Sequence, residues 1–370
     1  MRFIQTLKSL LFCLSIAIFT ITVGRASFTS FYAFGDGIST TTGNASGLAA
    51  YHEKRFCNGS IWIEVLCKWQ GITYLPARNN SYYGHTSAQL VTNTTAFVAP
   101  PGVPTALFAV WCVSADFVEF INNNPPPPSG YTSSNIPAWT SFINTSISRH
   151  VTAINTLYGK GARTIIMPNA ANVGEVPFYT EPGGFLVAPA NRTFVRDRTI
   201  QFNTALKNAI TTLTANNPGL TIHQPDVFTL FESVLANPSG YGLSNNGSDA
   251  IADFGLSVNK MVGPATSYLF WDDQHPSAKF QMLLADLSQQ LISPAKVTGV
   301  TFSGASGQIQ VANIPLGRNG IVQTSTNLQP PWTQVATIVE AVNTTKSVPL
   351  TGSGARSFYR VSFPVVWTWP

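Results

Sequence analysis

The chain has 370 residues, of which 44% are hydrophobic and only 10% are charged. This composition excludes an intrinsically disordered chain, and the length is enough for one large domain and a smaller one. Residues 1–26 hold three basic residues and no acidic one, so the net charge of +5 falls to +2 for the rest of the chain. No run of Lys and Arg follows, and we therefore expect no nucleic acid as a partner.

Residues 1–26 have the pattern of a secretory signal peptide. Arg2 and Lys8 precede a short apolar run at Leu10–Val23, and the small residues Gly24 and Ala26 lie where cleavage is expected. A single membrane anchor is the alternative, but the run is short for a span and no later segment resembles one. We predict a secreted, cell-surface or periplasmic protein with no transmembrane segment once the signal is removed.

The stretch Phe31–Asn44, which reads FYAFGDGISTTTGN, begins as an apolar strand and ends as a polar, Thr-rich loop. The strand breaks at Gly35-Asp36-Gly37. A parallel strand delivers a residue to the mouth of an α/β fold in this way, and active sites lie at that mouth. We therefore expect Gly37 to border the functional site.

Two segments lead from this loop to the next predicted strand. Arg55–Gln70 has the periodicity of a helix that Asn58 or Ser60 caps. Asn79–Gln89 follows as a polar loop whose Gly84 suits a tight turn.

Ala106–Val113 is a continuous apolar run with polar residues on both sides, which is typical of a strand buried on both faces. It ends in Ser114-Ala115-Asp116. A second set of polar residues therefore falls at the end of a buried strand.

The segment from residue 138 to residue 291 alternates helical patterns with short apolar strands. We predict helices at Ala138–Tyr158, Phe194–Leu213 and Pro276–Leu291, with strands at Arg163–Pro168 and Leu220–Pro225. This alternation, separated by Gly- and Pro-containing loops, predicts an α/β fold in the form of a three-layer α/β/α sandwich.

The sequence pattern changes after Pro294. Lys296–Pro364 consists of short alternating stretches that Gly, Pro and Asn separate, which indicates a small antiparallel β domain at residues 296–370. It resembles β-sandwich modules appended to secreted bacterial enzymes, many of which end in a strand similar to the FYRV found here. Substrate adhesion, surface docking and stabilisation are the roles that such a module suggests.

The cysteines do not predict a metal or redox site. Cys57, Cys67 and Cys112 remain after removal of the signal, and a disulfide between Cys57 and Cys67 is one option beside free thiols. No CxxC pair and no Gly-rich phosphate loop are present, so we expect neither a metal nor an organic cofactor.

Four blocks, in order along Phe28–Leu291, resemble the GDSL/SGNH lipase and esterase family. They are the FGDG of the first strand, the loop at Asn79–Gln89, the Ser114-Ala115-Asp116 segment, and FWDDQHPS at Phe270–Ser277, which contains the family's D-x-x-H-P element. The resemblance implies an ester hydrolase domain at residues 27–295, with a short parallel sheet and the site at the carboxyl ends of the strands.

The resemblance also implies roles for individual residues. His275 would be the general base, Asp272 would orient its imidazole, and the backbone N–H of Gly84 would donate to an oxyanion. Two positions depart from the family pattern: Gly37 replaces the nucleophilic Ser, and Ala115 replaces the Asn whose side chain is a second oxyanion donor.

These departures leave three functional hypotheses. The first is an ester hydrolase-like protein with lost or attenuated activity that binds an ester or an acylated carbohydrate. The second is an active esterase, with Ser39 or Ser114 as a relocated nucleophile or with a water that His275 activates while Asp36 or Asp116 assists. The third is a non-enzymatic surface or adhesion protein that acts through its C-terminal β domain.

Overall fold

The computed structural model describes residues 28–42, 49–258, 264–304, 306–339, 345–351 and 357–365. The predicted signal peptide at residues 1–26 lies outside these ranges. Among the described residues, no helix combines the length and the apolar character that a membrane span requires.

The centre of the large domain is a five-stranded parallel sheet with the strand order β2-β1-β3-β4-β5. Its strands are β1 (Phe31–Gly35), β2 (Asn79–Ser81), β3 (Leu107–Trp111), β4 (Thr164–Ile166) and β5 (Thr221–His223). Every residue of β1 and β3 is buried, as expected for strands that are covered on both faces. The two strands pair in register from Phe31 opposite Leu107 to Gly35 opposite Trp111.

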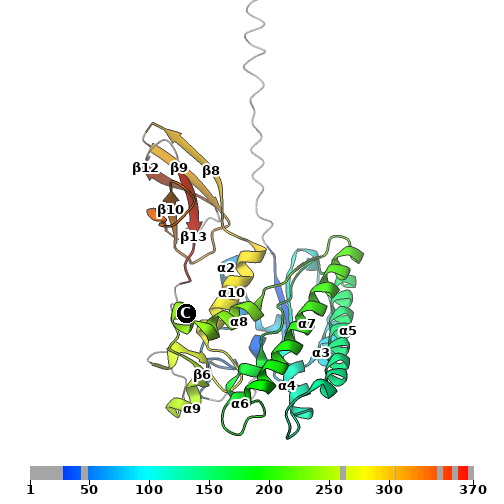
Figure 1. Cartoon of the computed structure of the whole chain (residues 1–370). Coiled ribbons are helices and arrows are strands. Elements are labelled where there is room, and N and C mark those ends of the chain that lie inside the picture. The colour runs from blue at the N-terminus through cyan, green and yellow to red at the C-terminus, as the bar shows by residue number, and fades with distance from the viewer. Residues whose placement is uncertain are drawn as a thin grey trace, which may run out of the picture.

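Helices cover both faces of this sheet, as Figure 1 shows. One group contains α2 (Trp62–Gln70) and α10 (Ala278–Ile292), which pack together. The other contains α3 (Ser87–Ala96), α5 (Ile136–Gly159) and α7 (Pro189–Asn216), with α5 in contact with both neighbours. The remaining helices are α4 (Val113–Asn123), α6 (Pro177–Thr180), α8 (Val227–Ala236) and α9 (Ala250–Phe254). The predicted three-layer α/β/α sandwich is confirmed.

The predicted helix at Arg55–Gln70 is wrong in its first part, because regular helix begins only at Trp62. Asn58, which we expected to cap this helix, instead accepts a hydrogen bond of 2.8 Å from the Ala278 N–H at the start of α10. Arg55 forms an ion pair with Glu64 inside α2. These long-range contacts hold the preceding segment in an irregular conformation.

A two-stranded parallel sheet, β6 (Asn245–Asp249) with β7 (Tyr268–Phe270), leads directly into the loop that carries Asp272 and His275. The main-chain N–H of Trp271 donates to the His275 carbonyl, and that of Ser277 donates to the Leu269 carbonyl. The loop is therefore closed by its own backbone hydrogen bonds before α10 begins.

The C-terminal part contains two three-stranded antiparallel sheets, which confirms the predicted small β domain. One sheet has the order β12-β9-β8 and the other β11-β10-β13. The bounds are β8 (Lys296–Ser303), β9 (Ser306–Ala312), β10 (Gly320–Ser325), β11 (Thr333–Ile338), β12 (Thr345–Thr351) and β13 (Phe358–Ser362). Ile309, Val311, Val322 and Val348 are among the residues of its own small apolar core.

Arg318 joins this domain to the first one. Its side chain is 6% exposed, its guanidinium lies 4.5 Å from the centre of the Trp69 ring, and it forms an ion pair with Asp286 of α10. It also donates to the Phe363 carbonyl. A buried guanidinium needs such partners, because desolvation without them is costly.

Candidate active site

His275 and Asp272 form a hydrogen-bonded pair in the loop between β7 and α10. The His275 Nδ1 lies 2.9 Å and 3.0 Å from the two carboxylate oxygens of Asp272. Since those oxygens accept, Nδ1 carries the proton and Nε2 keeps its lone pair when the ring is neutral. This is the arrangement of a general base with an orienting carboxylate.

Asp272 is held by several donors in addition to the imidazole. The backbone N–H groups of Gln274 and His275 donate to it at 2.9 Å and 2.6 Å, and the Tyr51 hydroxyl donates at 2.8 Å. Burial would raise the pKa of Asp272, but the charge and hydrogen bond of the His275 imidazole and the two backbone N–H groups hold that pKa below its usual value.

The same environment favours the imidazolium form of His275. Burial alone would lower the pKa of the ring, but the neighbouring Asp272, and after it Asp36, outweigh burial and raise the pKa. Phe56 stacks on the ring at a centroid distance of 4.8 Å and an angle of 21°. The orientation of the imidazole is therefore fixed both by charge and by an aromatic neighbour.

The end of β1 faces this imidazole with a bare glycine. A Cβ built on Gly37 would lie 2.6 Å from the Nε2 of His275, closer than real side chains approach. The ring therefore occupies space that a side chain at position 37 would need. The sequence prediction that His275 faces the end of the first strand agrees with this geometry.

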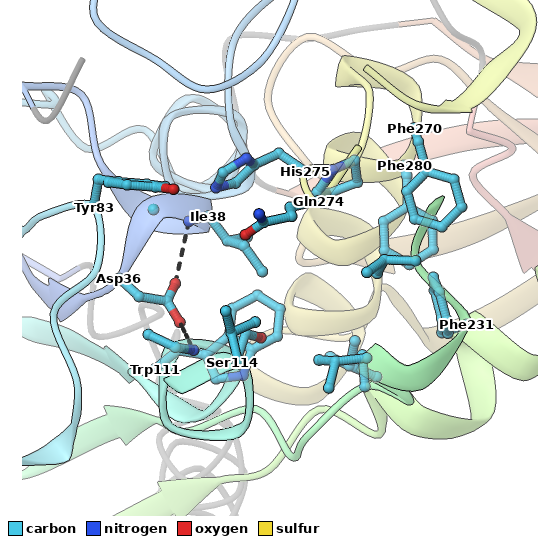
Figure 2. Close-up of a pocket in the computed structure, with 18 of the residues that line it drawn as sticks. Asp36, Ile38, Tyr83, Trp111, Ser114, Phe231, Phe270, Gln274, His275 and Phe280 are labelled. Atoms are coloured by element: carbon cyan, nitrogen blue, oxygen red, sulfur yellow. Dashed lines mark hydrogen bonds between the residues drawn. The ribbon is translucent and has the colours of Figure 1, made fainter. Parts of the chain in front are cut away.

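Asp36 lies beside Gly37 and links β1 to the start of α4. Its two carboxylate oxygens accept the backbone N–H groups of Ile38 at 3.1 Å and Ala115 at 3.2 Å, as Figure 2 shows. Burial dominates and raises the pKa of Asp36 to about 6, although both hydrogen bonds and the charge of His275 lower it. The Asp36 carboxylate therefore accepts two backbone hydrogen bonds, and the residue also lines the cavity.

The two predicted oxyanion positions differ in what they offer. Gly84 lines the cavity with a positive φ of 72°, open space surrounds its Cα, and its N–H meets no acceptor among the described residues. Ala115 also lines the cavity, but its N–H is used by Asp36 and its side chain is a methyl group. Only Gly84 retains a free donor at these two positions.

An apolar cavity of about 320 Å³ extends from His275 and Gly37 into the domain. Figure 2 shows His275, Gln274 and Tyr83 on one side of it, with Phe231, Phe270 and Phe280 bordering the same cavity. Its other apolar lining residues include Val118, Val173, Val176, Val227 and Leu284. Cavities of this size and lining bind small molecules with a large apolar part.

The two alternative serines are placed away from the base. Ser39 is 2% exposed, does not line the cavity, and accepts a hydrogen bond of 3.0 Å from the Trp62 indole. Ser114 lines the cavity, but its Oγ is buried and has no hydrogen-bond partner in the described part of the chain. Figure 2 shows Ser114 beside Trp111, away from His275. Neither hydroxyl lies within hydrogen-bonding distance of the imidazole.

Asp116 does not border this cavity. It accepts the backbone N–H of Ser87 at 2.7 Å, which caps α3, and also accepts the hydroxyl of Ser146. It lines a separate groove between α4 and α5. The hypothesis that Asp116 assists a water at His275 is therefore wrong, because its carboxylate is used in a different place.

Tyr51 and Phe56 are the functional neighbours that the sequence did not reveal. Both lie in an irregular segment, far along the chain from the residues that they contact. No periodicity in the sequence marks either residue. Cys57, Cys67 and Cys112 are buried free thiols, so the optional disulfide between Cys57 and Cys67 is absent.

Comparison with known proteins identifies a related family. The family model described as GDSL-like lipase/acylhydrolase matches residues 31–288. One GDSL esterase/lipase of Arabidopsis thaliana is 25% identical over 187 residues, which are 48% of this chain and 50% of the relative. GDSL esterase/lipase 7 of the same plant is 26% identical over 174 residues, which are 44% and 47% of the two chains. The chain thus spans about half the length of the curated relatives it matches.

Solved structures give weaker similarities. Axe2, an acetylxylan esterase from Geobacillus stearothermophilus, is 14% identical with a TM-score of 0.38 and covers 72% of this chain and 96% of its own. LAE5, an alpha/beta hydrolase enzyme from the metagenome of Lake Arreo, is 13% identical with a TM-score of 0.37, covering 71% and 94%. TM-scores this low give no information about the activity of this chain.

Proposed function

The chain belongs to the GDSL-like lipase/acylhydrolase family, and from this premise we propose that it binds an ester while its serine-esterase turnover is lost or strongly attenuated. The ligand is an ester or an acylated carbohydrate whose acyl part fills the apolar cavity. His275 and Gly84 are residues of the family pattern that line that cavity, and Asp272 is hydrogen-bonded to His275 behind it.

One observation carries the proposal: no hydroxyl of the described residues lies within hydrogen-bonding distance of His275 Nε2. Gly37 stands where the family has its nucleophile, and its Cα faces the imidazole directly. Acyl transfer through a covalent intermediate needs a nucleophile whose proton the base can accept. A base without that partner supports binding better than turnover.

The expected loss of rate is large. Removing the serine of a catalytic triad lowers turnover on the order of a millionfold. The missing carboxamide at Ala115 removes one oxyanion donor, a change that costs on the order of a hundred- to a thousandfold when it occurs alone. These effects are not additive, but either one leaves an enzyme far below ordinary esterase rates.

The size of the cavity supports a medium-length acyl chain. At ~30 Å³ for each water-sized group, a volume of about 320 Å³ holds on the order of ten such groups. Burying apolar surface contributes roughly 25 cal/mol for each Å² removed from water. An aliphatic chain of about this length therefore gains binding energy from the cavity walls without any covalent step.

A second candidate function is hydrolysis by a water that His275 activates. The Nε2 of His275 favours it, since this nitrogen keeps its lone pair and borders the cavity, where a water can donate a proton to it. The water oxygen would form the bond to the ester carbonyl carbon while its proton passes to Nε2, and the alcohol would leave with a proton. Asp36 borders the same cavity and supports the imidazolium that forms.

The experiment compares wild type with two single variants, Gly37→Ser and Gly37→Ala. Purified protein is incubated with p-nitrophenyl octanoate and, separately, with a labelled fluorophosphonate. We expect no labelling of wild type or Gly37→Ala, and labelling of Gly37→Ser. The alanine variant forces the same displacement of His275 without supplying a hydroxyl, so it controls for the steric change.

The outcomes separate the hypotheses. Labelling of wild type contradicts the proposal, because it requires a nucleophilic hydroxyl that we have not identified. Turnover of wild type without labelling, abolished in His275→Ala, supports the activated water. If the ester binds only to residues 296–370, the non-enzymatic hypothesis for the C-terminal β domain replaces both.

We also infer that the chain is exported, to the medium, the cell surface or the periplasm. The charged start, short apolar run and small residues of segment 1–26 support this. N-terminal sequencing of the exported protein should begin after Ala26, and a cell-associated protein that still carries Met1 would contradict the inference.

A further inference from the structure

A second cavity lies next to the first one on the far side of the His275 loop. Its volume is about 310 Å³, and its lining comes from α6, from the loop after α6 and from Asp273. Consecutive residues divide between the two cavities: Val176 and Gln274 line the first, while Pro177 and Asp273 line the second. The two cavities therefore adjoin along the loop that carries His275, which follows Asp273 by two residues.

The second cavity is built by backbone constraints rather than by mobile side chains. The Phe178 N–H donates to the Asp273 carbonyl at 2.9 Å, which fixes α6 to the His275 loop. Gly183 has a φ of 98°, and a Cβ on Gly184 would lie 2.4 Å from the Tyr179 carbonyl oxygen. Only glycine suits these two positions, so the shape of the loop is set before any ligand arrives.

The chemistry of this cavity differs from that of the acyl cavity. Phe178 and Phe185 supply aromatic surface, and Glu181 and Asp273 supply two carboxylates. Within the described ranges, neither carboxylate has an ion pair or a hydrogen bond through its side chain. Burial, and then the nearby Asp272 and Asp249, raise the pKa of Asp273 to about 6, which shows that its charge is poorly compensated.

We propose that this second cavity receives the alcohol part of the bound ester, and that this part carries a substituted ammonium group. The inference rests on the proposed function, since it assigns the other end of the same ligand. A cation would gain from both carboxylates and from the faces of the phenylalanine rings, which attract positive charge. An anionic alcohol would meet Glu181 and Asp273 and be repelled.

The test uses two esters with the same acyl chain and nearly the same shape. Octanoylcholine carries a quaternary ammonium group, and 3,3-dimethylbutyl octanoate replaces its nitrogen by carbon. Titration calorimetry on the full chain measures both affinities, while proton NMR checks that neither ester is hydrolysed. We expect the choline ester to bind about tenfold more tightly.

Two isosteric variants locate the effect. Asp273→Asn and Glu181→Gln should each reduce the preference for the choline ester severalfold, and together should remove it. Both should leave the affinity for the neutral ester within about twofold of wild type. Asp197→Asn, which removes an exposed carboxylate on α7, is the matched control and should leave the preference unchanged.

Failure of this inference differs from failure of the proposed function. Equal binding of both esters by wild type overturns the ammonium site and keeps the acyl cavity. A sugar octanoate that binds as tightly as the choline ester also overturns it, because an uncharged alcohol then suffices. If neither octanoyl ester binds, the proposed acyl cavity itself is contradicted.

Discussion

The two sides of the cleft differ in how much of the family's machinery they keep. On one side, Asp272 receives two backbone N–H groups, the Tyr51 hydroxyl and the imidazole, and Phe56 stacks on that ring. On the other side, Gly37 has no side chain and Ala115 offers only a methyl group. The base is fully supported, whereas position 37 carries no hydroxyl and position 115 carries no carboxamide, and only the Gly84 N–H is a free donor at the predicted oxyanion positions.

The oriented imidazole therefore faces a glycine rather than a hydroxyl. An oriented imidazole beside a carboxylate can hold a ligand through a hydrogen bond or activate a water. A buried carboxylate needs hydrogen-bond donors, because desolvation without them is costly, so the donors around Asp272 also serve the fold. Variants that alter one side of the cleft and leave the other intact test this difference.

The largest expected effect comes from restoring the depleted side. We expect the double variant Gly37→Ser/Ala115→Asn to hydrolyse p-nitrophenyl octanoate on the order of a hundredfold faster than Gly37→Ser alone, because the carboxamide supplies an oxyanion donor. Steady-state kinetics measures this. Ala115→Asn without the serine should stay inactive, and a double variant no faster than the single one would mean that residue 115 does not face the reacting carbonyl.

The next effect concerns Asp36 and pH. The pKa of the Asp36 carboxyl is raised to about 6 in the folded protein, from an ordinary value near 3.8. The contribution of Asp36 to the unfolding free energy is therefore complete below its pKa in the unfolded chain, and it is lost as the pH rises through 6. Asp36→Asn should remove this loss. Relative to the variant, wild type should lose up to about 3 kcal/mol of unfolding free energy between pH 4 and pH 7.

Urea unfolding at several pH values measures this difference. The raised pKa of His275 acts in the same direction, since its contribution is also lost as pH rises through the folded pKa. Because the charge of Asp36 helps to raise the pKa of His275, the comparison measures the Asp36 carboxyl together with its coupling to that imidazole. Parallel pH profiles of the two proteins would contradict the assignment of the raised pKa to this carboxyl.

A smaller effect is expected on the well-supported side. Tyr51→Phe removes one hydroxyl from Asp272 and should lower the unfolding free energy by about 1 kcal/mol, because a partly buried carboxylate loses one donor. Thermal unfolding followed by circular dichroism measures it. Tyr82→Phe is the control, since Tyr82 is exposed and no hydrogen bond joins it to Asp272 in the described part of the chain. If Tyr51→Phe leaves the unfolding free energy unchanged, the remaining donors are sufficient to stabilise the Asp272 carboxylate.

The smallest expected effect is that of Ser114→Ala. The Ser114 hydroxyl has no hydrogen-bond partner among the residues that the structure describes, so its removal should change the unfolding free energy by less than about 0.5 kcal/mol. The labelling of Gly37→Ser should also persist in a Gly37→Ser/Ser114→Ala background. Loss of labelling there would return Ser114 to the list of candidate nucleophiles.

Much of this comparison could be predicted from the sequence. The continuous apolar runs of β1 and β3 identified buried parallel strands, and the D-x-x-H-P spacing identified the pair of Asp272 and His275. These features are local, since a few consecutive residues determine each of them. The glycine at position 37 was visible for the same reason.

The remaining features depend on long-range packing, which no local pattern records. Tyr51 reaches Asp272 across more than two hundred residues of chain, and Asn58 caps α10 rather than the helix that follows it. The apolar cavity is lined by residues of α4, α8 and α10. In the sequence, each of these apolar residues looks like an ordinary core position of its helix. Ser39 was a candidate nucleophile in the sequence, but it is buried and its hydroxyl accepts a hydrogen bond from the Trp62 indole.

The contacts of Arg318 restrict how the small β domain can rotate relative to the large domain. The guanidinium connects the strand end at Phe363, the aromatic ring of Trp69 and the middle of α10, and α10 starts directly after the His275 loop. Two of these partners, Trp69 and Asp286, belong to the large domain, and such a joint resists rotation better than a flexible linker does. Anchoring the small domain to a surface would therefore also fix the direction in which the mouth of the cleft points.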